Sequence, residues 1–399
     1  MTADGGAVDP RVWQGEPTVR DVGEFGLIER FRRRLGSTPD PATGTGAPAG
    51  VSTTTVSGSS AGASTTTVSG SSAAGSHGIG DDAAIFTPEP GWDLLLTCDM
   101  QIEGRHFQRR WLTPRELGAR AAAVNLSDVA AMGGLPVGAL LSLGLPPGLP
   151  LAVLDEFFDG FVAGLGAHGA AVLGGNISAA DDLLIDVTLI GRVEQGMALR
   201  RDGARPGDVL FVTGAPGRAA AALASLDADP AVWRRLAERL EEDAPPAELR
   251  ERFRRALAAP RARLAAGRYL LENRLATAAI DTSDGLAGDL RHLCDESGLG
   301  AVIEEVFLPV DPDLTQLAAL LDRDPLAWML GASDDYELLF AVAPECADLV
   351  FAMRDIIGLR VSPVGVLSAG PPEVTLRTAE GTRRPLAGGW DHLSSREAQ

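Results

Sequence analysis

Short apolar runs alternate with longer stretches of helical periodicity along most of the chain from Gly78 onward. In the first half of this region the apolar runs have the composition of strands, and they cover residues 83–86, 94–98, 139–145, 170–175 and 183–191. Strands interleaved with helices are typical of folds in which helices pack on a sheet. The pattern therefore predicts an α/β fold of the α+β sandwich type.

The helix over residues 114–132 has the clearest boundaries. Thr113 suits the N-cap position, Pro114 suits the first turn, and Glu116 stands three residues after the cap, as in a capping box. The helical pattern continues to about Met132 and stops before two consecutive glycines. These signals predict one helix from residue 114 to about residue 132.

The second half of the chain also alternates between strands and helices. The predicted strands are 209–213, a run that ends at Asp281, 338–343 and 361–367, and the predicted helices extend up to Pro260 and start again near Gly285. We place the boundary between the two predicted domains near residues 196–206. The chain is therefore predicted to contain two domains, 78–200 and 201–399.

The first 36 residues contain one amphipathic segment. Its large apolar residues are spaced for one helical face, and they are Phe25, Ile28, Phe31 and Leu35. The arginines at 30 and 32–34 fall largely elsewhere, so we interpret them as a solvated face. We expect residues 1–36 to form an arm whose helix docks on the rest of the protein.

Residues 37–77 have the composition of a flexible insert. They are almost entirely Ser, Thr, Gly, Ala and Pro, and a twelve-residue unit occurs twice, at 52–63 and 64–75. A segment with so few large apolar residues cannot build a core. Two copies of a small polar unit are also too few for a repeat architecture, which needs three or more stacked units.

Charge and residue choice exclude several classes of function. The chain carries 35 basic and 54 acidic residues, and its formal net charge of −19 argues against nucleic-acid or anionic-membrane partners. All 35 basic residues are arginine. Chemistry that requires lysine, such as Schiff-base formation or a Walker A phosphate loop, is therefore excluded.

We also expect a cytoplasmic protein with no membrane segment. No run of eighteen apolar residues occurs, and the N-terminus lacks a basic segment followed by an apolar one. The three cysteines, Cys98, Cys294 and Cys346, are too few and too scattered for a disulfide framework or a zinc site.

Acidic residues recur at positions that gather around a cleft. Four of them follow predicted strands or lie in turns, and these are Asp82, Asp99, Asp281 and Asp284. Asp128 lies near the end of the predicted helix, where the helix dipole disfavours a carboxylate unless a cation is near. Acids that converge repel each other unless their pKa values rise or metal ions neutralise them. Ligands that are all oxygens favour Mg²⁺.

Other features have plainer interpretations beside the functional ones. Asp284 suits a helix-capping role about as well as a metal-ligand role, and His106 suits a structural role as well as a substrate contact. The GxGxxG segment at 164–169 follows a helix and precedes a strand, which is the reverse of a dinucleotide-binding site. The turn at 214–217 follows a strand and opens a helix, so it could bind phosphate or be a plain turn.

Eight segments of the chain resemble one known family, in the family's own order. They are GEFGLIERF (23–31), GIGDDAAIF (78–86), TCDMQIEGRHF (97–107), AVNLSDVAAMGGLP (123–136), LRRDGARPGD (199–208), IDTSDGLAGDL (280–290), DDYELLF (334–340) and GWDHL (389–393). Together they cover nearly the whole chain outside the insert. On these motifs the chain is similar to thiamine-monophosphate kinases, which share a superfamily with aminoimidazole ribonucleotide synthetase.

The resemblance implies a fold, an assembly and an activity. The implied assembly is a homodimer in which the sheets of the N-terminal domains pack together, and each chain adds a C-terminal α/β domain. The implied reaction is direct in-line transfer of a phosphoryl group from ATP to thiamine monophosphate, with several Mg²⁺ ions. No covalent nucleophile is expected, because catalysis by positioning and charge neutralisation is enough to join two polyanions.

The resemblance also implies roles for individual residues. The implied metal shell is Asp82, Thr97, Asp99, Asp128, Asp281 and Asp284, with Asn176 as a further candidate. The implied ATP contacts are Arg201, Ser283, Gly175 and Asn176. The implied substrate contacts are His106, Asp334 and Trp390, whose indole would offer an aromatic face to the thiamine rings.

Three positions depart from the family's pattern. Asn176 stands where the family has a metal-binding carboxylate, Asp334 shortens a glutamate, and Cys98 replaces the common Ser or Thr. We expect weakened or rearranged metal binding rather than lost activity. Two alternatives stay open: a sister ATP-dependent synthetase of the same superfamily, and a catalytically weakened protein that binds ATP or thiamine phosphate.

Overall fold

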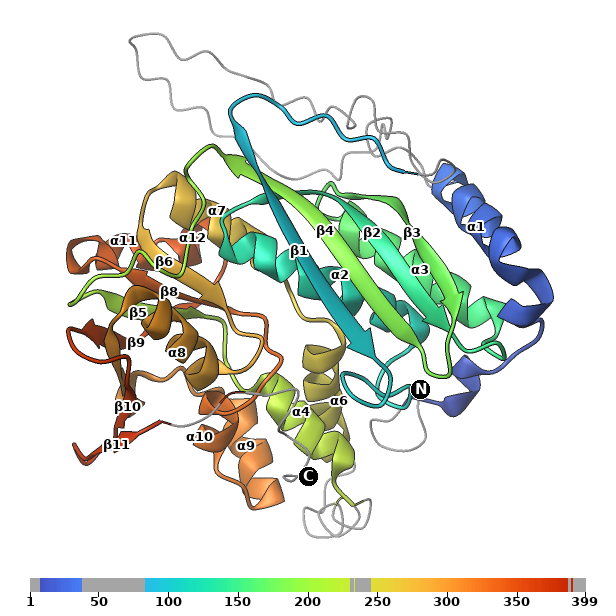
Figure 1. The fold of residues 1–399 in the computed structure, drawn as a ribbon. Coiled ribbons are helices and arrows are strands. Elements are labelled where there is room, and N and C mark those ends of the chain that lie inside the picture. Colours follow the sequence, from blue (N-terminus) through green and yellow to red (C-terminus); the bar gives the residue numbers. More distant parts are fainter. Residues whose placement is uncertain (1–7, 38–82, 230–232, 234–244, 387–388, 390–399) are drawn as a thin grey trace.

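The computed structural model describes residues 8–37, 83–229, 233, 245–386 and 389. Within these residues the chain forms two β-sheets with helices packed against them (Figure 1). The first sheet contains strands up to Glu194, and the second contains strands from Val209 onward. Almost all of the insert lies outside the described residues, so its flexibility stays a prediction.

The N-terminal sheet has four strands in the order β1-β4-β2-β3. They are β1 (Trp92–Ile102), β2 (Leu135–Leu145), β3 (Ala171–Ala179) and β4 (Leu184–Glu194). Only β2 and β3 run parallel. Each strand extends beyond the apolar run that predicted it, because polar residues at alternate positions also join the ladder.

The strand predicted over 83–86 is wrong. These residues belong to no ladder with the strands of the described chain, and Ile85 is 55% exposed. A short apolar run has the composition of a strand, but a strand also needs a neighbour for its backbone hydrogen bonds.

Helices α2 (Pro114–Ala131) and α3 (Leu151–Gly166) cover one face of the first sheet (Figure 1). The predicted capping box is confirmed, because the Thr113 hydroxyl accepts from the Glu116 N–H and the Glu116 carboxylate accepts from the Thr113 N–H. The two helices approach closely at Gly160, where a Cβ would lie 2.0 Å from a carbonyl oxygen of α2.

The other face of the first sheet carries exposed apolar side chains. Leu94, Leu96 and Met100 alternate along β1 and are 39%, 69% and 48% exposed. Thr97 and Asp99 lie on the opposite side of the strand, which faces α2.

The N-terminal arm packs on α3 through α1 (Val19–Ser37). The ring of Phe31 stacks on Phe158 with centroids 4.0 Å apart. One position of the predicted docking face is wrong, because Phe25 is 84% exposed and Leu27 is buried in its place. Leu27 and Phe31 are four residues apart and therefore lie on the same side of the helix.

The interpretation of the α1 arginines as a solvated face holds for Arg32 and Arg33, which are exposed, but not for Arg30 and Arg34. Arg30 forms an ion pair with Asp155 of α3, and Arg34 donates hydrogen bonds of 2.9 and 2.6 Å to Asp159. The two arginines are four residues apart on α1, and their two partners are four residues apart on α3. The two ion pairs therefore lie one helical turn apart along the helices. The partners are 125 positions apart in the chain, so the sequence pattern did not reveal them.

The C-terminal sheet has seven strands in the order β11-β10-β7-β9-β5-β8-β6. They are β5 (Val209–Thr213), β6 (Ala276–Asp281), β7 (Gly300–Glu304), β8 (Leu338–Val342), β9 (Val361–Ser368), β10 (Val374–Arg377) and β11 (Arg383–Pro385). All neighbours are antiparallel except β10 and β7. The four strands predicted in this half are confirmed as β5, β6, β8 and β9.

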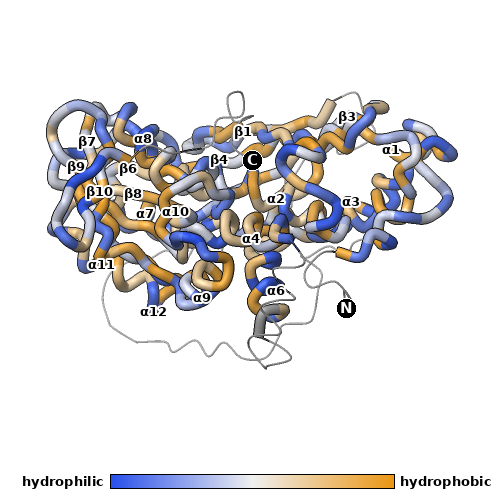
Figure 2. Tube along the Cα trace, turned by 90° about the horizontal axis from the view of Figure 1, so that it is seen from below, coloured by the Kyte–Doolittle hydropathy of each residue, from blue (hydrophilic) through white to orange (hydrophobic). Residues whose placement is uncertain are grey.

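Short helices surround this sheet. They are α4 (Arg218–Asp227), α6 (Pro245–Ala258), α7 (Leu264–Glu272), α8 (Leu286–Ser297), α9 (Pro312–Leu321), α10 (Pro325–Leu330), α11 (Ala347–Phe351) and α12 (Met353–Ile357), with the 3₁₀ turns η2 (Glu305–Phe307) and η3 (Pro344–Cys346). A further 3₁₀ turn, η1 (Pro10–Trp13), belongs to the N-terminal arm. Figure 2 shows α6 alternating between hydrophobic and hydrophilic positions, as expected for a helix with one buried side. Among the described residues, no helix combines the length and apolar content that a membrane crossing needs.

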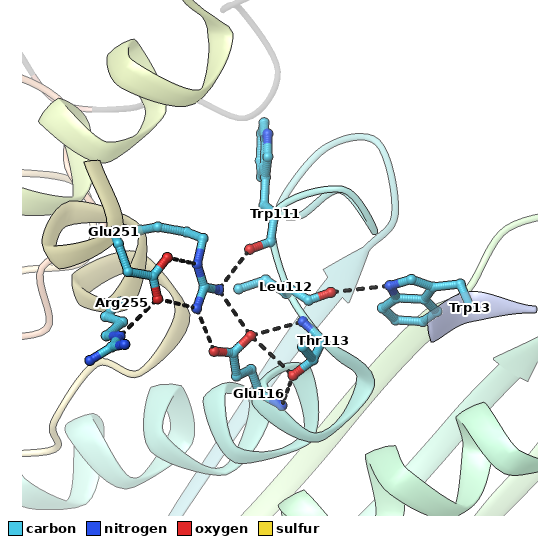
Figure 3. Close-up of polar contacts among 8 residues, drawn as sticks. Trp13, Trp111, Leu112, Thr113, Glu116, Glu251 and Arg255 are labelled. Atoms are coloured by element: carbon cyan, nitrogen blue, oxygen red, sulfur yellow. Dashed lines mark hydrogen bonds and ion pairs between the residues drawn. The ribbon is translucent and has the colours of Figure 1, made fainter. Parts of the chain in front are cut away.

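The two halves meet along α2, which packs against β6, α6 and α7. Figure 3 shows one polar junction, where α6 reaches the N-terminus of α2. The Arg254 guanidinium donates to Glu251, to Glu116 and to the Trp111 carbonyl. Trp13 of the arm donates to the Leu112 carbonyl at 3.1 Å, so the arm joins the same segment. This junction fixes α2, which carries the predicted site residue Asp128.

Candidate active site

Strand β1 and helix α2 bring three of the predicted site residues together. Thr97 and Asp99 lie two residues apart on β1 and therefore both face α2. The Thr97 hydroxyl donates a hydrogen bond to the Asp128 carboxylate, and Asp128 lies close enough to Asp99 for its charge to raise the pKa of Asp99. The polar side chains at the end of α2 thus form a cluster with the first sheet.

Asp281 joins this cluster from the other half of the chain. It is the last residue of β6, it is 3% exposed, and its Oδ2 accepts a 2.7 Å hydrogen bond from the Ser127 hydroxyl. Because Ser127 and Asp128 are adjacent on α2, the helix contacts a carboxylate from each sheet. The sequence predicted Asp281 for the site but did not identify Ser127.

The carboxylates of the cluster resist ionisation. Burial, together with the charges of Asp128 and Asp281, raises the pKa of Asp99 to about 7. Burial and the charge of Asp128 raise the pKa of Asp281 to about 7. Burial also raises the pKa of Asp128, although Thr97 and Arg201 act in the opposite direction. Negative charge is therefore concentrated here beyond what the neighbouring cations balance.

A fourth acidic group extends the cluster along α8. Burial and the charges of Asp281 and Asp284 raise the pKa of Asp289 to about 8, and the Asp289 carboxylate accepts from the Asp284 N–H at 3.1 Å. The N-cap of α8 is Gly285 rather than Asp284, so the capping alternative for Asp284 is not what the structure shows. Ser283 lies in the same turn. The sequence missed Asp289, although the quoted segment IDTSDGLAGDL contains it.

No three His, Cys, Asp or Glu side chains of the described chain come close enough together to hold one metal ion. The carboxylates meet instead in pairs, such as Asp99 with Asp128. This arrangement fits Mg²⁺, which commonly takes one or two carboxylates and completes its shell with water and substrate phosphates. Asp82, the remaining predicted acidic ligand, lies outside the described residues.

Arg201 lies close enough to lower the pKa values of Asp128, Asp281 and Asp289. The Ser297 hydroxyl holds the Arg201 backbone through a 2.6 Å hydrogen bond to its carbonyl. A guanidinium beside the acidic cluster can bind phosphate oxygens.

Asn176 and Gly175 are not part of this cluster within one chain. Strand β3 and strand β1 are the two edges of the first sheet, separated by β4 and β2. Asn176 is in register with Ser142 on β2, and this row continues through Asp186 to Met100, on the face away from α2. Thr97 and Asp99 lie on the other face, so the metal and ATP roles of Asn176 stay predictions.

His106 contacts the end of β1. The His106 Nδ1 accepts from the Ile102 N–H at 3.0 Å, which fixes the turn after β1. This contact supports the structural alternative and leaves the substrate role a prediction. Trp390 lies outside the described residues.

Asp334 has a partner that the sequence did not reveal. Its Oδ2 accepts a 2.7 Å hydrogen bond from Arg120, a residue of α2 that is only 2% exposed. Arg120 stands seven residues before Ser127 and eight before Asp128, a spacing of about two helical turns that could have identified it.

The turn at 214–217 is not a phosphate-binding loop in this structure. The Gly217 and Ala219 N–H groups at the start of α4 donate to the carboxylate of Asp335, and the Ala220 N–H donates to Ser333. These donors are the ones a phosphate would need. The GxGxxG segment at 164–169 ends α3 and precedes β3, which confirms that it is not a dinucleotide fingerprint.

Comparison with known proteins relates this geometry to a family. Two family models match the chain: AIR synthase related protein, N-terminal domain, over residues 80–193, and AIR synthase related protein, C-terminal domain, over residues 205–376. The thiamine-monophosphate kinase of Synechococcus elongatus is 33% identical over 323 residues, which are 79% of this chain and 91% of that protein. The chain belongs to the thiamine-monophosphate kinase family. The relative from Bacillus subtilis is 31% identical over 320 residues, or 79% of this chain and 93% of the relative.

Solved structures of the family share the fold. The thiamine-monophosphate kinase from Stenotrophomonas maltophilia K279a matches with a TM-score of 0.64 and 33% identity, over 76% of this chain and 90% of that chain. The structure described as AaThiL complexed with AMPPCP and TMP matches with a TM-score of 0.63 and 28% identity, over 95% of this chain and all of that chain. These matches confirm the predicted two-domain α/β fold.

Proposed function

We propose that this protein transfers the terminal phosphoryl group of ATP to thiamine monophosphate, which yields ADP and thiamine diphosphate. The observation that carries the proposal is the convergence of Thr97, Asp99, Asp128 and Asp281 where α2 meets both sheets, in a member of the thiamine-monophosphate kinase family. A related structure, AaThiL, is complexed with AMPPCP and TMP.

We propose Mg²⁺ as the metal of this site, with Asp99, Asp128 and Asp281 supplying one or two carboxylates to each ion. Their raised pKa values indicate buried carboxylates that need more positive charge than Arg201 supplies. When bound, Mg²⁺ supplies charge neutralisation for the phosphates of both substrates. Oxygen ligands in pairs are the set that this ion prefers.

The chain's own residues would act by positioning. Ser127 and Thr97 hold the carboxylates of Asp281 and Asp128 in fixed orientations through hydrogen bonds. Arg201 would bind phosphate oxygens of the nucleotide. An oxygen of the acceptor phosphate then forms a bond to the γ-phosphorus while the bond to the bridging oxygen of ADP breaks, so no covalent nucleophile from the protein is needed.

We also propose that the protein is a homodimer whose N-terminal sheets pack through their outer faces. The exposed Leu94, Leu96 and Met100 on β1 provide an apolar strip for such packing. Leu96→Glu should convert the dimer into a monomer in analytical ultracentrifugation. A variant that keeps the wild-type mass would place the interface elsewhere.

The activity is tested by incubating the purified protein with ATP and thiamine monophosphate and separating the products by chromatography. We expect thiamine diphosphate and ADP in equal amounts with Mg²⁺, no product with EDTA, and no phosphorylation of free thiamine. Turnover in EDTA would exclude the metal-dependent mechanism. Binding of both substrates without product would favour the catalytically weakened alternative.

A further inference from the structure

Arg120 is buried in an unusual way for a charged residue. It is the largest of the fully buried side chains in the described part of the chain, at 2% exposed. Its Nη1 donates to the Leu257 carbonyl at 2.6 Å, and its Nη2 donates to Asp334 at 2.7 Å. The guanidinium also lies 5.6 Å from the ring centroid of Tyr336. A buried ion pair adds little net stability, because the cost of desolvation offsets the attraction, so this arrangement calls for a functional reason.

The contacts of Arg120 link both halves of the molecule. Arg120 belongs to α2, whereas Leu257 lies at the end of α6 and Asp334 precedes β8. A cation at the C-terminal end of α6 is favoured by the helix dipole and satisfies a carbonyl that lacks a helical partner. Arg120 is also about 11 Å along α2 from the end that carries Ser127 and Asp128. The same helix therefore holds the acidic cluster and Asp334 at a fixed separation.

Asp334 lies in a segment whose backbone is held rigidly. The Tyr336 N–H donates to the Thr282 carbonyl at 2.8 Å, and the Glu337 N–H donates to the Thr282 hydroxyl at 3.1 Å. Tyr336 has φ of +53°, a conformation that non-glycine residues adopt only when the surroundings impose it. Thr282 follows Asp281, so the Asp334 segment is attached to the acidic cluster.

The carboxylate of Asp334 is held from its inner side. Its side chain is 36% exposed, whereas the side chain of Arg120 is 2% exposed. Arg120 binds Oδ2, which directs the outer part of the carboxylate towards solvent. A carboxylate fixed in this way presents negative charge to a ligand without losing rotamer entropy on binding.

We propose that Arg120 is a positioning residue for substrate recognition: it fixes Asp334 so that the outer carboxylate oxygen binds the positively charged heterocycle of thiamine monophosphate. This inference rests on the proposed function. An arginine suits the task because its planar fork makes two hydrogen bonds in different directions and its face packs on an aromatic ring, whereas lysine is a point charge. A contact between Asp334 and this heterocycle should affect the binding of thiamine monophosphate and leave the binding of ATP unchanged.

The test is a kinetic cycle in the full-length protein with Arg120→Lys, Asp334→Asn and the double variant. We expect Arg120→Lys to raise the KM for thiamine monophosphate about tenfold while the KM for ATP changes less than about twofold. Asp334→Asn should have a similar effect. In the double variant the effects should not multiply, because Arg120 acts through Asp334.

Arg254→Met is the matched control. Arg254 is also a buried arginine that links the two halves, but its partners are Glu116 at the start of α2, Glu251 of α6 and the Trp111 carbonyl, and it does not contact Asp334. This variant should lower the melting temperature and keep the wild-type KM for thiamine monophosphate. It therefore separates loss of stability from loss of substrate recognition.

Several outcomes would overturn the inference. A wild-type KM for thiamine monophosphate in Arg120→Lys, an equal rise in both KM values, or multiplied effects in the double variant would each show that Arg120 does not act through Asp334 on this substrate. Failure of the proposed function is distinguishable, since the wild-type protein itself would then form no thiamine diphosphate.

Discussion

Asp99, Asp128 and Asp281 approach one another although they come from three different elements. Burial raises the pKa of each, and the charge of Asp128 raises those of Asp99 and Asp281 further, to about 7. Folding therefore brings together charges that repel each other, a cost that a binding site tolerates when ligands supply the missing positive charge. The site is in this sense destabilising until its ligands bind.

Replacing one carboxylate of the cluster should separate activity from stability. We expect Asp99→Asn or Asp128→Asn to lower kcat/KM by well over tenfold, or about 1.4 kcal/mol or more of barrier. The metal-free melting temperature should stay the same or rise, because one repelling charge is gone. Asp182→Asn, at an exposed position, is the control for a neutralised surface charge. Full activity in both cluster variants would show that the site assignment is wrong.

Helix α1 shows how one element is held by a few side chains. Phe31 is 5% exposed and stacks on Phe158 of α3, whereas Phe25 on the same helix is 84% exposed. The ion pairs from Arg30 and Arg34 to α3 are partly exposed and contribute less, because solvent screens them. The apolar contact therefore dominates the docking of the arm.

Phe31→Ala should lower the free energy of unfolding by roughly 3 kcal/mol, the usual cost of removing a buried ring. Phe25→Ala is the matched control on the same helix and should change it by less than about 0.5 kcal/mol. Urea denaturation of both variants measures the difference. Equal effects of the two substitutions would contradict the observed docking face.

The start of α2 has a pH-dependent contribution to stability. Burial of Glu116 favours its neutral form, but hydrogen bonds from Arg254 and from the Thr113 N–H outweigh this and lower the pKa of Glu116. A carboxyl group whose pKa is lowered in the folded state stabilises the protein when the pH is above the unfolded-state pKa, which is 4.5 for Glu116. This stabilisation is lost as the pH falls through the folded-state pKa.

Glu116→Gln should therefore lower the free energy of unfolding by roughly 1 to 2 kcal/mol at pH 7, since it weakens both the cap and the ion pair. The difference from the wild type should shrink as the pH is lowered from about 5 to 3. Thermal unfolding across this range measures it, with Glu248→Gln, at an exposed position of α6, as control. A pH-independent difference would exclude the ionised form of Glu116 as the source.

At the scale of the whole molecule, arginines make several of the polar contacts between the two halves. Arg254 uses all of its donors on Glu116, Glu251 and the Trp111 carbonyl (Figure 3), and Arg268 of α7 binds Glu194 at the end of β4 at 2.8 Å. Burial opposes the charged form of Arg254, but the hydrogen bonds to Glu251 and Glu116 raise its pKa. Because the chain contains no lysine, every basic residue between the two halves is an arginine. Its guanidinium can bind carboxylates in two directions at once.

Deleting residues 40–75 should shift the melting temperature by only a few degrees and leave the activity and the proposed dimer intact. The composition of the segment offers almost nothing to bury, and the entropy of closing a loop varies slowly with its length. Calorimetry and analytical ultracentrifugation of the deletion variant measure both properties. Loss of the dimer would show that the insert takes part in assembly.

The sequence by itself predicted most of the strands, helix α2, the family and a candidate set of site residues. Periodicity and capping signals predicted α2 and eight strands, and motifs identified Asp99, Asp128 and Asp281, because these signals are local in the chain. Only the tertiary structure decided which side chains meet: Arg120 with Asp334 across 214 positions, Ser127 with Asp281, and Asn176 on the sheet face away from Asp99. It also removed the strand at 83–86. Such pairings depend on how strands and helices pack, and packing is set by contacts between residues far apart in the chain, which no local pattern records.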